Sequence, residues 1–142
     1  MTTHGTASTA APTVHLPSST LLRRALRLDA VVTGLNGAAY LLAAPLLDDV
    51  LGLDPTLLRA VGAFLLAYAA VVWVVGSRPE ISRAAARAVV AVNAVWALDG
   101  LAVAATGWGS PTAVGTAWIV AQAGVVGAFA VLQWAGLRAA RG

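Results

Sequence analysis

The 142-residue sequence contains no cysteine and no lysine, and its two histidines, His4 and His15, lie near the N-terminus. Without cysteine, the chain forms no disulfide, thiolate nucleophile or iron–sulfur cluster. Without a histidine in its apolar segments, it cannot hold a haem between two membrane-embedded imidazoles. The absence of cysteine therefore excludes thiol-based redox chemistry, and the position of the two histidines excludes a haem held within the membrane.

Sequence motifs of the common enzyme classes are missing as well. We find no H-E-x-x-H, no G-x-S-x-G, no Walker loop and no G-x-G-x-x-G after a strand. A serine–histidine arrangement would have to recruit a histidine from the N-terminal tail. We therefore expect a protein that is not an enzyme and that holds no cofactor and no metal.

Charge is scarce and hydrophobic residues are abundant. Only 11% of the residues are charged and 59% are hydrophobic, whereas about 25% of the residues of a soluble domain are charged. Four apolar runs have the length of about 20 residues that crosses about 30 Å of hydrocarbon as a helix. The fold class expected is all-α, a transmembrane four-helix bundle, with the lipid bilayer as its first partner.

The apolar runs and the polar stretches between them divide the chain. We expect a disordered tail over residues 1–20, which is rich in Thr, Ser, Ala and Pro and lacks hydrophobic periodicity. Ser18, Ser19 and Thr20 are candidates for the N-cap of the first helix. Pro45 is expected to kink or end the first span. The membrane domain is expected at 21–138, with spans at 26–47, 57–75, 84–105 and 112–134, followed by a short tail at 139–142.

The nine arginines indicate the orientation in the membrane. Eight of them fall on one side of a four-span arrangement, and only Arg59 falls on the other. Because positively charged short loops stay on the cytoplasmic side, both termini are expected to be cytoplasmic. The arginines form no stripe on a folded surface, which argues against nucleic acid as a partner. The composition suits a GC-rich bacterial genome, so the membrane expected is a bacterial plasma membrane.

Two pairs of similar tripeptides suggest an internal duplication. Leu35-Asn36-Gly37 is similar to Leu98-Asp99-Gly100, and Asp54-Pro55-Thr56 is similar to Ser110-Pro111-Thr112. With two spans in each half, the halves would be parallel repeats. Three-residue matches also arise by chance in an apolar chain, so a bundle without repeats is the alternative.

The third span contains an acidic residue, Asp99, whose carboxylate is unfavourable in contact with lipid. An ionisable residue near mid-bilayer costs about 2.5 to 3.5 kcal/mol on insertion scales and normally has a partner. Arg59 enters the second span from the same side and can snorkel toward Asp99. A buried Asp99–Arg59 pair is the structural hypothesis; a proton-loading or cation-loading site at Asp99 is the functional one.

One face of the first span is polar. Asp29, Thr33, Asn36 and Tyr40 follow one another at spacings of four, three and four residues, which places them on the same side of a helix. This face is expected to point inward. Asp29 lies near the cytoplasmic boundary, where we expect it either to be neutralised by Arg83 or Arg87 or to interact with the positive end of the helix dipole.

Two amides in the later spans, Asn93 and Gln122, can form hydrogen bonds between helices, each contributing about 0.6 to 2 kcal/mol in membranes. The alternative is a ligand pocket lined by Asn36, Asn93, Asp99 and Gln122. In the fourth span, the small residues at Ala117, Ala121, Gly124 and Gly127 permit close packing or dimerisation. A homo-oligomer or a membrane-protein partner is therefore expected.

Four apolar stretches together resemble a known group: RALRLDAVVTGLNGAAYLLAAPLL, LLRAVGAFLLAYAAVVWVVGSRP, AVNAVWALDGLA and PTAVGTAWIVAQAGVVGAFAVLQWAGLR. They are similar to small four-span integral membrane proteins of GC-rich bacteria, over about residues 22–138. The resemblance implies a membrane location and no activity. Small multidrug exporters have a similar length, but their first span carries a glutamate, whereas this chain has only Asp29 near one end.

Three functions remain open. The first is a non-enzymatic membrane protein that acts through association with itself or a partner. The second is a small transporter or channel-like protein that uses Asp99 and neighbouring amides as a proton, cation or polar-ligand site. The third is an enzyme that acts on a lipid or quinone.

Overall fold

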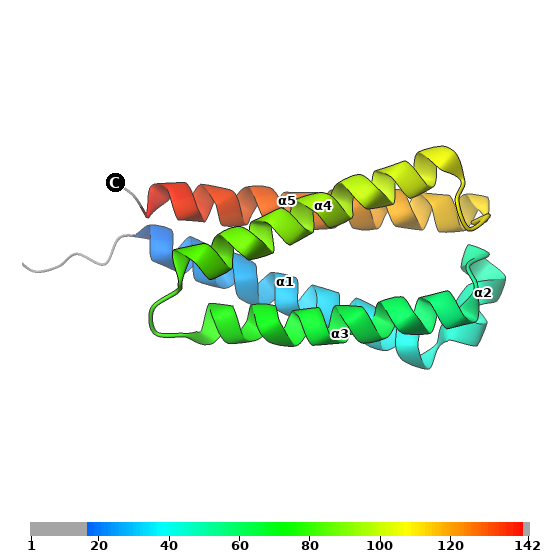
Figure 1. Cartoon of the computed structure of the whole chain (residues 1–142), viewed down its shortest axis with the longest axis horizontal. Helices are drawn as coiled ribbons and strands as arrows, with labels where there is room; N and C mark the ends of the chain where they lie inside the picture. The colour runs from blue at the N-terminus through cyan, green and yellow to red at the C-terminus, as the bar shows by residue number, and fades with distance from the viewer. Residues whose placement is uncertain (1–16, 141–142) are drawn as a thin grey trace, which may run out of the picture.

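The computed structural model describes residues 17–140, which are mostly helical. Five helices follow one another along the chain: α1 (Pro17–Leu42), α2 (Ala44–Leu51), α3 (Pro55–Ser77), α4 (Arg83–Thr106) and α5 (Ala113–Ala139) (Figure 1). The expected all-α fold is confirmed. Of the expected tails, residues 1–16 and 141–142 lie outside the described residues. Helix α1 already begins at Pro17, before the N-cap candidates.

The expected first span, residues 26–47, is not one helix. Helix α1 ends at Leu42, and α2 begins at Ala44 with a bend of 94° between the two. Pro45 occupies the first turn of α2. Because proline has no backbone N–H and its ring crowds the preceding turn, α1 cannot continue through this position. The chain instead starts a new helix, in which the proline stands where no donor is needed.

The three long helices that follow each start at a capping side chain. Asp54 accepts hydrogen bonds from the backbone N–H groups of Thr56 and Leu57, at 2.8 and 3.0 Å, at the start of α3. Ser82 caps α4 and Thr112 caps α5 in the same way. These caps satisfy N–H groups that have no partner inside a helix. The expected spans 57–75 and 84–105 fall within α3 and α4.

Small residues let α1 and α3 cross closely. A Cβ atom added to Gly37 would lie 2.9 Å from the Gly62 carbonyl oxygen, and one added to Gly62 would lie 2.7 Å from the Gly37 oxygen. Only glycine fits at both places, which is typical of helix crossings in membranes. Helix α1 also packs on α5, and α4 packs on α5. Helices α3 and α4 meet over a short stretch only, and α4 slopes away from α3 toward the end that carries α2 (Figure 1).

The surface is far more apolar than that of a soluble protein, and a few polar side chains lie inside the apolar core. Large apolar side chains point outward, among them Leu35, Leu98 and Val131, which are each 67 or 68% exposed. Polar side chains are buried inside. Three helices, α3, α4 and α5, are long and apolar enough to cross a membrane, and the bent pair α1–α2 is a fourth if it counts as one broken span. Since soluble proteins rarely expose apolar surface on this scale, the fold is that of a multi-pass helical membrane protein.

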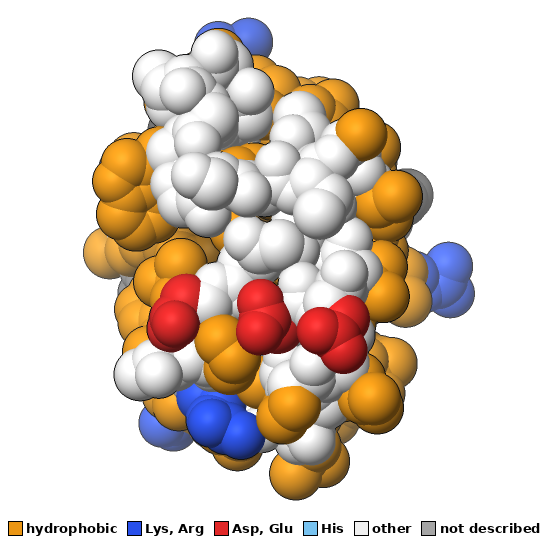
Figure 2. All heavy atoms as spheres, turned by 90° about the vertical axis from the view of Figure 1, so that its right-hand side faces the viewer, with side chains coloured by type: hydrophobic (Ala, Val, Ile, Leu, Met, Phe, Trp, Pro, Cys, Tyr) orange, Lys and Arg blue, Asp and Glu red, His pale blue; other side chains and the backbone are white. Residues whose placement is uncertain are grey.

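The two ends of the bundle carry opposite charges. The start of α1, the α3–α4 loop and the end of α5 lie together at one end (Figure 1), which we call the arginine end. It carries the arginines Arg23, Arg24, Arg27, Arg78, Arg83, Arg87 and Arg138. The opposite end, the α2 end, shows a row of acidic side chains (Figure 2). Helix α2 and the loop after it supply Asp48, Asp49 and Asp54 there.

Candidate functional site

A carboxylate, Asp29 of α1, lies at the centre of a hydrogen-bonded cluster inside the bundle. Its side chain is fully buried, with 0% of its surface exposed. One carboxylate oxygen, Oδ2, accepts from Asn93 Nδ2 of α4 at 2.6 Å and from Gln133 Nε2 of α5 at 2.7 Å. The other, Oδ1, accepts from Thr33 Oγ1 one turn along α1 at 3.0 Å. A single acid thus joins three of the four long helices.

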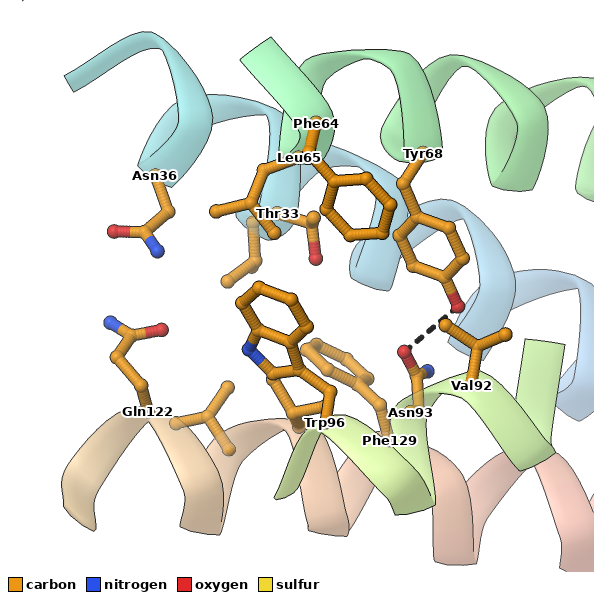
Figure 3. A pocket seen from close by; sticks show the side chains of 13 residues that line it. Thr33, Asn36, Phe64, Leu65, Tyr68, Val92, Asn93, Trp96, Gln122 and Phe129 are labelled. Carbon is orange, nitrogen blue, oxygen red and sulfur yellow. Dashed lines mark hydrogen bonds between the residues drawn. The ribbon is translucent and has the colours of Figure 1, made fainter. Parts of the chain in front are cut away.

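The amides extend this cluster to the fourth long helix. Asn93 Nδ2 donates a second hydrogen bond to Gln133 Oε1 at 3.2 Å. The hydroxyl of Tyr68, on α3, donates to Asn93 Oδ1 at 2.9 Å (Figure 3). No buried side-chain nitrogen or oxygen in the described part of the chain lacks a hydrogen-bond partner. We call Asp29, Thr33, Tyr68, Asn93 and Gln133 the Asp29 cluster.

Both sequence-based interpretations of Asp29 are wrong. Its partners are a hydroxyl and two neutral amides, whereas Arg83 donates to the Ala140 carbonyl oxygen at 2.7 Å. Arg87 is exposed on the outside of the bundle. Asp29 is also far beyond the first turn of α1, where the positive end of a helix dipole acts. The hydrogen bonds across the bundle hold this carboxylate instead.

A small, partly enclosed cavity adjoins the Asp29 cluster. Its volume is about 20 Å³, enough for about one water molecule. Thr33, Tyr68 and Asn93 of the cluster form part of its wall. Asn36 and Gln122 add two further amides, and Figure 3 shows these two side chains facing one another from α1 and α5. A polar space of this size in an apolar bundle is suited to an ordered water.

A larger pocket opens toward the α2 end. Its volume is about 310 Å³, which is at the small end of the range for ligand pockets. Its wall is mostly aliphatic and aromatic and contains one charged side chain: Tyr40, Leu53, Leu57, Leu58, Val61, Trp96, Asp99, Gly100, Val103, Trp108, Ile119, Gln122 and Ala123. We call it the Asp99 pocket.

The cavity and the pocket share a wall. Trp96 and Gln122 line both. The ring of Trp96 stacks on Phe64 of α3 with ring centres 5.5 Å apart, closing the short seam between α3 and α4. One amide and one indole therefore belong to the wall of the open pocket and to the wall of the cavity beside the Asp29 cluster.

The structure divides the expected ligand-pocket residues between these two spaces. Asn36 and Asn93 line the cavity, Asp99 lines the larger pocket, and Gln122 lines both. Asp99 and Arg59 are both exposed. Within residues 17–140 no hydrogen bond joins them, and Arg59 is not among the residues that line the Asp99 pocket. Their pairing stays a prediction.

Sequence reasoning missed two members of the Asp29 cluster, Gln133 and Tyr68. Gln133 is fully buried, and it lies eleven residues, about three helical turns, after Gln122 on α5. That spacing puts both glutamines on one face of the helix and could have identified Gln133. Tyr68 lies in a run of Ala, Leu and Val, where nothing in the sequence distinguishes a hydrogen-bonded tyrosine from a packed one.

Of the two pairs of similar tripeptides, one has similar contacts in the two halves of the structure and the other does not. Gly37 packs against α3 and Gly100 against α5, so these two glycines contact the partner helix of their own half. The second pair differs, because Asp54 caps α3 whereas Thr112 and not Ser110 caps α5. The repeat stays a prediction.

No protein-family model, curated protein or solved structure matches the chain. The class of the protein therefore rests on its own residues, as an integral membrane protein with three or four spanning helices.

Proposed function

We propose that the protein is a non-enzymatic, four-span protein of the bacterial plasma membrane that binds a small organic cation in the Asp99 pocket. The arginine end would face the cytoplasm, together with both termini, and the α2 end would face outward. This orientation is supported by the seven arginines of the arginine end, against Arg59 alone near the other. The resemblance to small four-span proteins of GC-rich bacteria agrees with this location and supplies no substrate.

The charge and lining of the Asp99 pocket carry the ligand assignment. Asp99 is the single charged residue of its wall, and Trp96, Trp108 and Tyr40 supply aromatic surface. A carboxylate beside aromatic faces attracts organic ammonium groups, since the face of an aromatic ring is electronegative. The aliphatic remainder of the wall suits an apolar substituent of the same molecule.

Binding of benzyltrimethylammonium to the purified protein in detergent tests this proposal. We expect it to change the tryptophan fluorescence, and we expect its neutral isostere, with carbon in place of nitrogen, to bind more weakly. Asp99→Asn should weaken binding of the cation about tenfold to a hundredfold, because the Coulomb attraction between unit charges about 4 to 5 Å apart is about 3 to 4 kcal/mol at an effective dielectric constant of about 20, and desolvation offsets part of it. Binding of the isostere should not change.

Asp49→Asn is the matched control, because it removes the same charge from an exposed position of α2 at the same end. It should leave binding of the cation unchanged. Equal loss in both variants would mean that the acidic surface attracts the cation and that the pocket does not bind it. Equal affinity for the cation and the isostere would also rule out the assignment to Asp99.

Reporter fusions test the orientation. A cytoplasmic reporter should be active at either terminus and inactive within the α4–α5 turn at residues 107–112. Cytoplasmic activity in that turn would reverse the orientation and would place the Asp99 pocket on the inner face.

A second candidate function, self-association, is favoured by the outer face of α5. Ala117, Ala121, Gly124 and Ala128 are exposed there, and a Cβ atom added to Gly124 would meet nothing within 4 Å. Rows of small residues permit close contact between helices in membranes. Gly124→Leu should then lower the crosslinked dimer fraction, whereas Ala70→Leu, on the exposed side of α3, should not. Unchanged crosslinking by Gly124→Leu would exclude this face.

A further inference from the structure

The buried carboxylate of Asp29 has no counter-charge within its cluster. Its hydrogen-bond donors are Thr33, Asn93 and Gln133, which are all neutral. Burying a carboxylate without a compensating positive charge costs free energy in a low-dielectric interior. Ionisable residues inside membrane proteins therefore usually mark functional sites. Such a group can gain or lose a proton only through water or through a hydrogen-bonded hydroxyl that water reaches.

The bundle interior toward the arginine end is packed with apolar side chains. Those beside Asp29 and toward that end, each at most 5% exposed, are called the apolar plug: Leu22, Leu26, Ala30, Val72, Ala86, Val89 and Leu137. Leu22 lies seven residues before Asp29, about 10 Å along the helix. The plug contains no polar side chain to bind water.

The way to the α2 end is lined in part by polar side chains. From the Asp29 cluster it leads into the cavity of about 20 Å³ and past the facing amides of Asn36 and Gln122 (Figure 3). Beyond Gln122 it enters the Asp99 pocket, which opens at the α2 end. Every stage offers a hydrogen-bonding side chain, and the cavity has room for one water, which is what a chain of waters requires.

We propose that Asp29 is a proton-binding site connected to the outer aqueous phase alone, through a half-channel formed by the Asp99 pocket, the Asn36–Gln122 amide pair and the buried cavity. A proton from outer water reaches Asp29 through the Thr33 hydroxyl, which lines the cavity and bonds to Asp29 Oδ1. It adds to that carboxylate oxygen and returns the same way; only O–H bonds form and break. The outer assignment rests on the proposed orientation. The path itself does not depend on ligand binding at Asp99.

Few groups other than Asp29 can titrate or carry charge at this site. Helix α3 presents Tyr68, which reaches Asp29 through Asn93. Helices α4 and α5 present the neutral amides of Asn93 and Gln133. On α1 itself, the Arg27 guanidinium lies over the Trp73 ring, 5.8 Å from its centre, on the exposed side of the bundle. Protonation of Asp29 is therefore the event that changes the charge of this part of the bundle.

The cysteine-free sequence gives a background of zero for an accessibility experiment. Single cysteines are exposed to Ag⁺, a water-sized ion that binds thiolates, from either side of oriented membrane vesicles. The remaining thiols are then labelled with a maleimide after denaturation. Val126→Cys reports on the buried cavity. Val131→Cys, which faces lipid, and Val89→Cys, in the apolar plug, are matched controls.

We expect Val126→Cys to react with Ag⁺ from the outer side at least about tenfold faster than from the inner side. It should also react faster than either control. Adding Gln122→Leu should slow this reaction by a similar factor and leave Val103→Cys, in the Asp99 pocket, unchanged. Thr33→Cys, on the opposite wall of the cavity, is the second reporter if Val126→Cys does not fold. A reaction no faster than that of Val131→Cys, or equal from both sides, overturns the half-channel.

Infrared difference spectra between two outer pH values test the proton itself. We expect a carboxyl band that is present in the wild type and absent from Asp29→Asn, whose cavity should still admit Ag⁺ to Val126→Cys. A cavity that admits Ag⁺ without any such band would overturn the proton assignment. These results are independent of the cation-binding proposal, because Asp99→Asn should weaken binding of benzyltrimethylammonium without changing the reaction at Val126→Cys.

Discussion

The arginine end and the α2 end of the bundle are built from the same long helices, yet the space between these helices is packed at the first and hollow at the second. At the arginine end, α1, α3, α4 and α5 converge on the apolar plug, and Arg23 donates to the carbonyl oxygens of Gly76, Arg78 and Pro79 at 2.6 to 3.0 Å. At the α2 end, α4 diverges from α3, and a pocket of about 310 Å³ opens between them.

Both ends have a packed apolar cluster, which at the α2 end consists of Tyr40, Ala44, Leu51, Leu53, Leu58 and Leu65, but the hydrogen bonds that hold the two ends differ. The arginine end uses side-chain packing and a guanidinium that satisfies helix-end carbonyls. The α2 end uses a clamp, in which Thr112 donates its N–H to Leu51 O at 2.9 Å and its hydroxyl to Val50 O at 2.7 Å. A clamp fixes the helix ends without filling the space between them. The open end can therefore hold a ligand while the closed end provides stability.

Removal of the central carboxylate should have the largest effect, because the Asp29 cluster lies where the closed and open parts meet. Asp29→Ala removes the acceptor of Thr33, whose hydroxyl can turn to a carbonyl of its own helix. It leaves one N–H of Asn93 and one of Gln133 unpaired. We expect the free energy of unfolding in mixed micelles to fall by about 2 to 6 kcal/mol, at about 1 to 3 kcal/mol for each orphaned donor. Asp49→Ala, at an exposed position, should change it by less than about 0.5 kcal/mol. Similar values for the two variants would contradict a structural role for the cluster.

A pair of matched leucine variants compares the two ends directly. Leu26→Ala, at a fully buried position of the apolar plug, should lower the free energy of unfolding by about 2 to 5 kcal/mol. Leu57→Ala, in the wall of the Asp99 pocket, should lower it by less than about 1.5 kcal/mol, because the pocket is already open and less packing is lost. Unfolding titrations in the same micelles measure both. Equal losses would mean that the α2 end is as tightly packed as the arginine end.

Loosening the clamp should have a moderate effect. Thr112→Val removes the hydrogen bond to Val50 O and the cap on the Gly115 N–H. We expect the free energy of unfolding to fall by about 1 to 2 kcal/mol, as for the loss of an N-cap. Thr106→Val is the control, because its hydroxyl bonds only to carbonyls of its own helix. If the two variants behave alike, the contact between α2 and α5 does not stabilise the α2 end.

The smallest effect expected is the coupling between Asp99 and Arg59. The sequence predicts that they pair, whereas in the described residues the two exposed side chains share no hydrogen bond. A double-mutant cycle with Asp99→Asn and Arg59→Gln should give a coupling below about 0.5 kcal/mol. A larger coupling would restore the pair and would mean that the pocket carboxylate is already neutralised, which would disfavour cation binding.

Particular residues show how far sequence alone can reach in this protein. The four-residue spacing of Asp29 and Thr33 predicted their common helical face, and Pro45 predicted the break near the end of the first span. The sequence did not predict a second helix bent by 94°, since a proline ends a helix without fixing the direction of the next one. It also favoured Asp99 over Asp29 as the buried acid, because depth along a span says nothing about which acid the neighbouring helices cover.

The sequence by itself determined the helical class, the membrane as solvent and the charge difference between the two ends, because these depend on composition and on the order of residues along the chain. Only the tertiary structure decided that Asp29 bonds to Asn93 and Gln133, 64 and 104 residues away, and that Asp99 lines an open pocket. Those outcomes depend on how the helices cross and diverge, which small residues such as Gly37 and Gly62 set through contacts with partners distant in sequence.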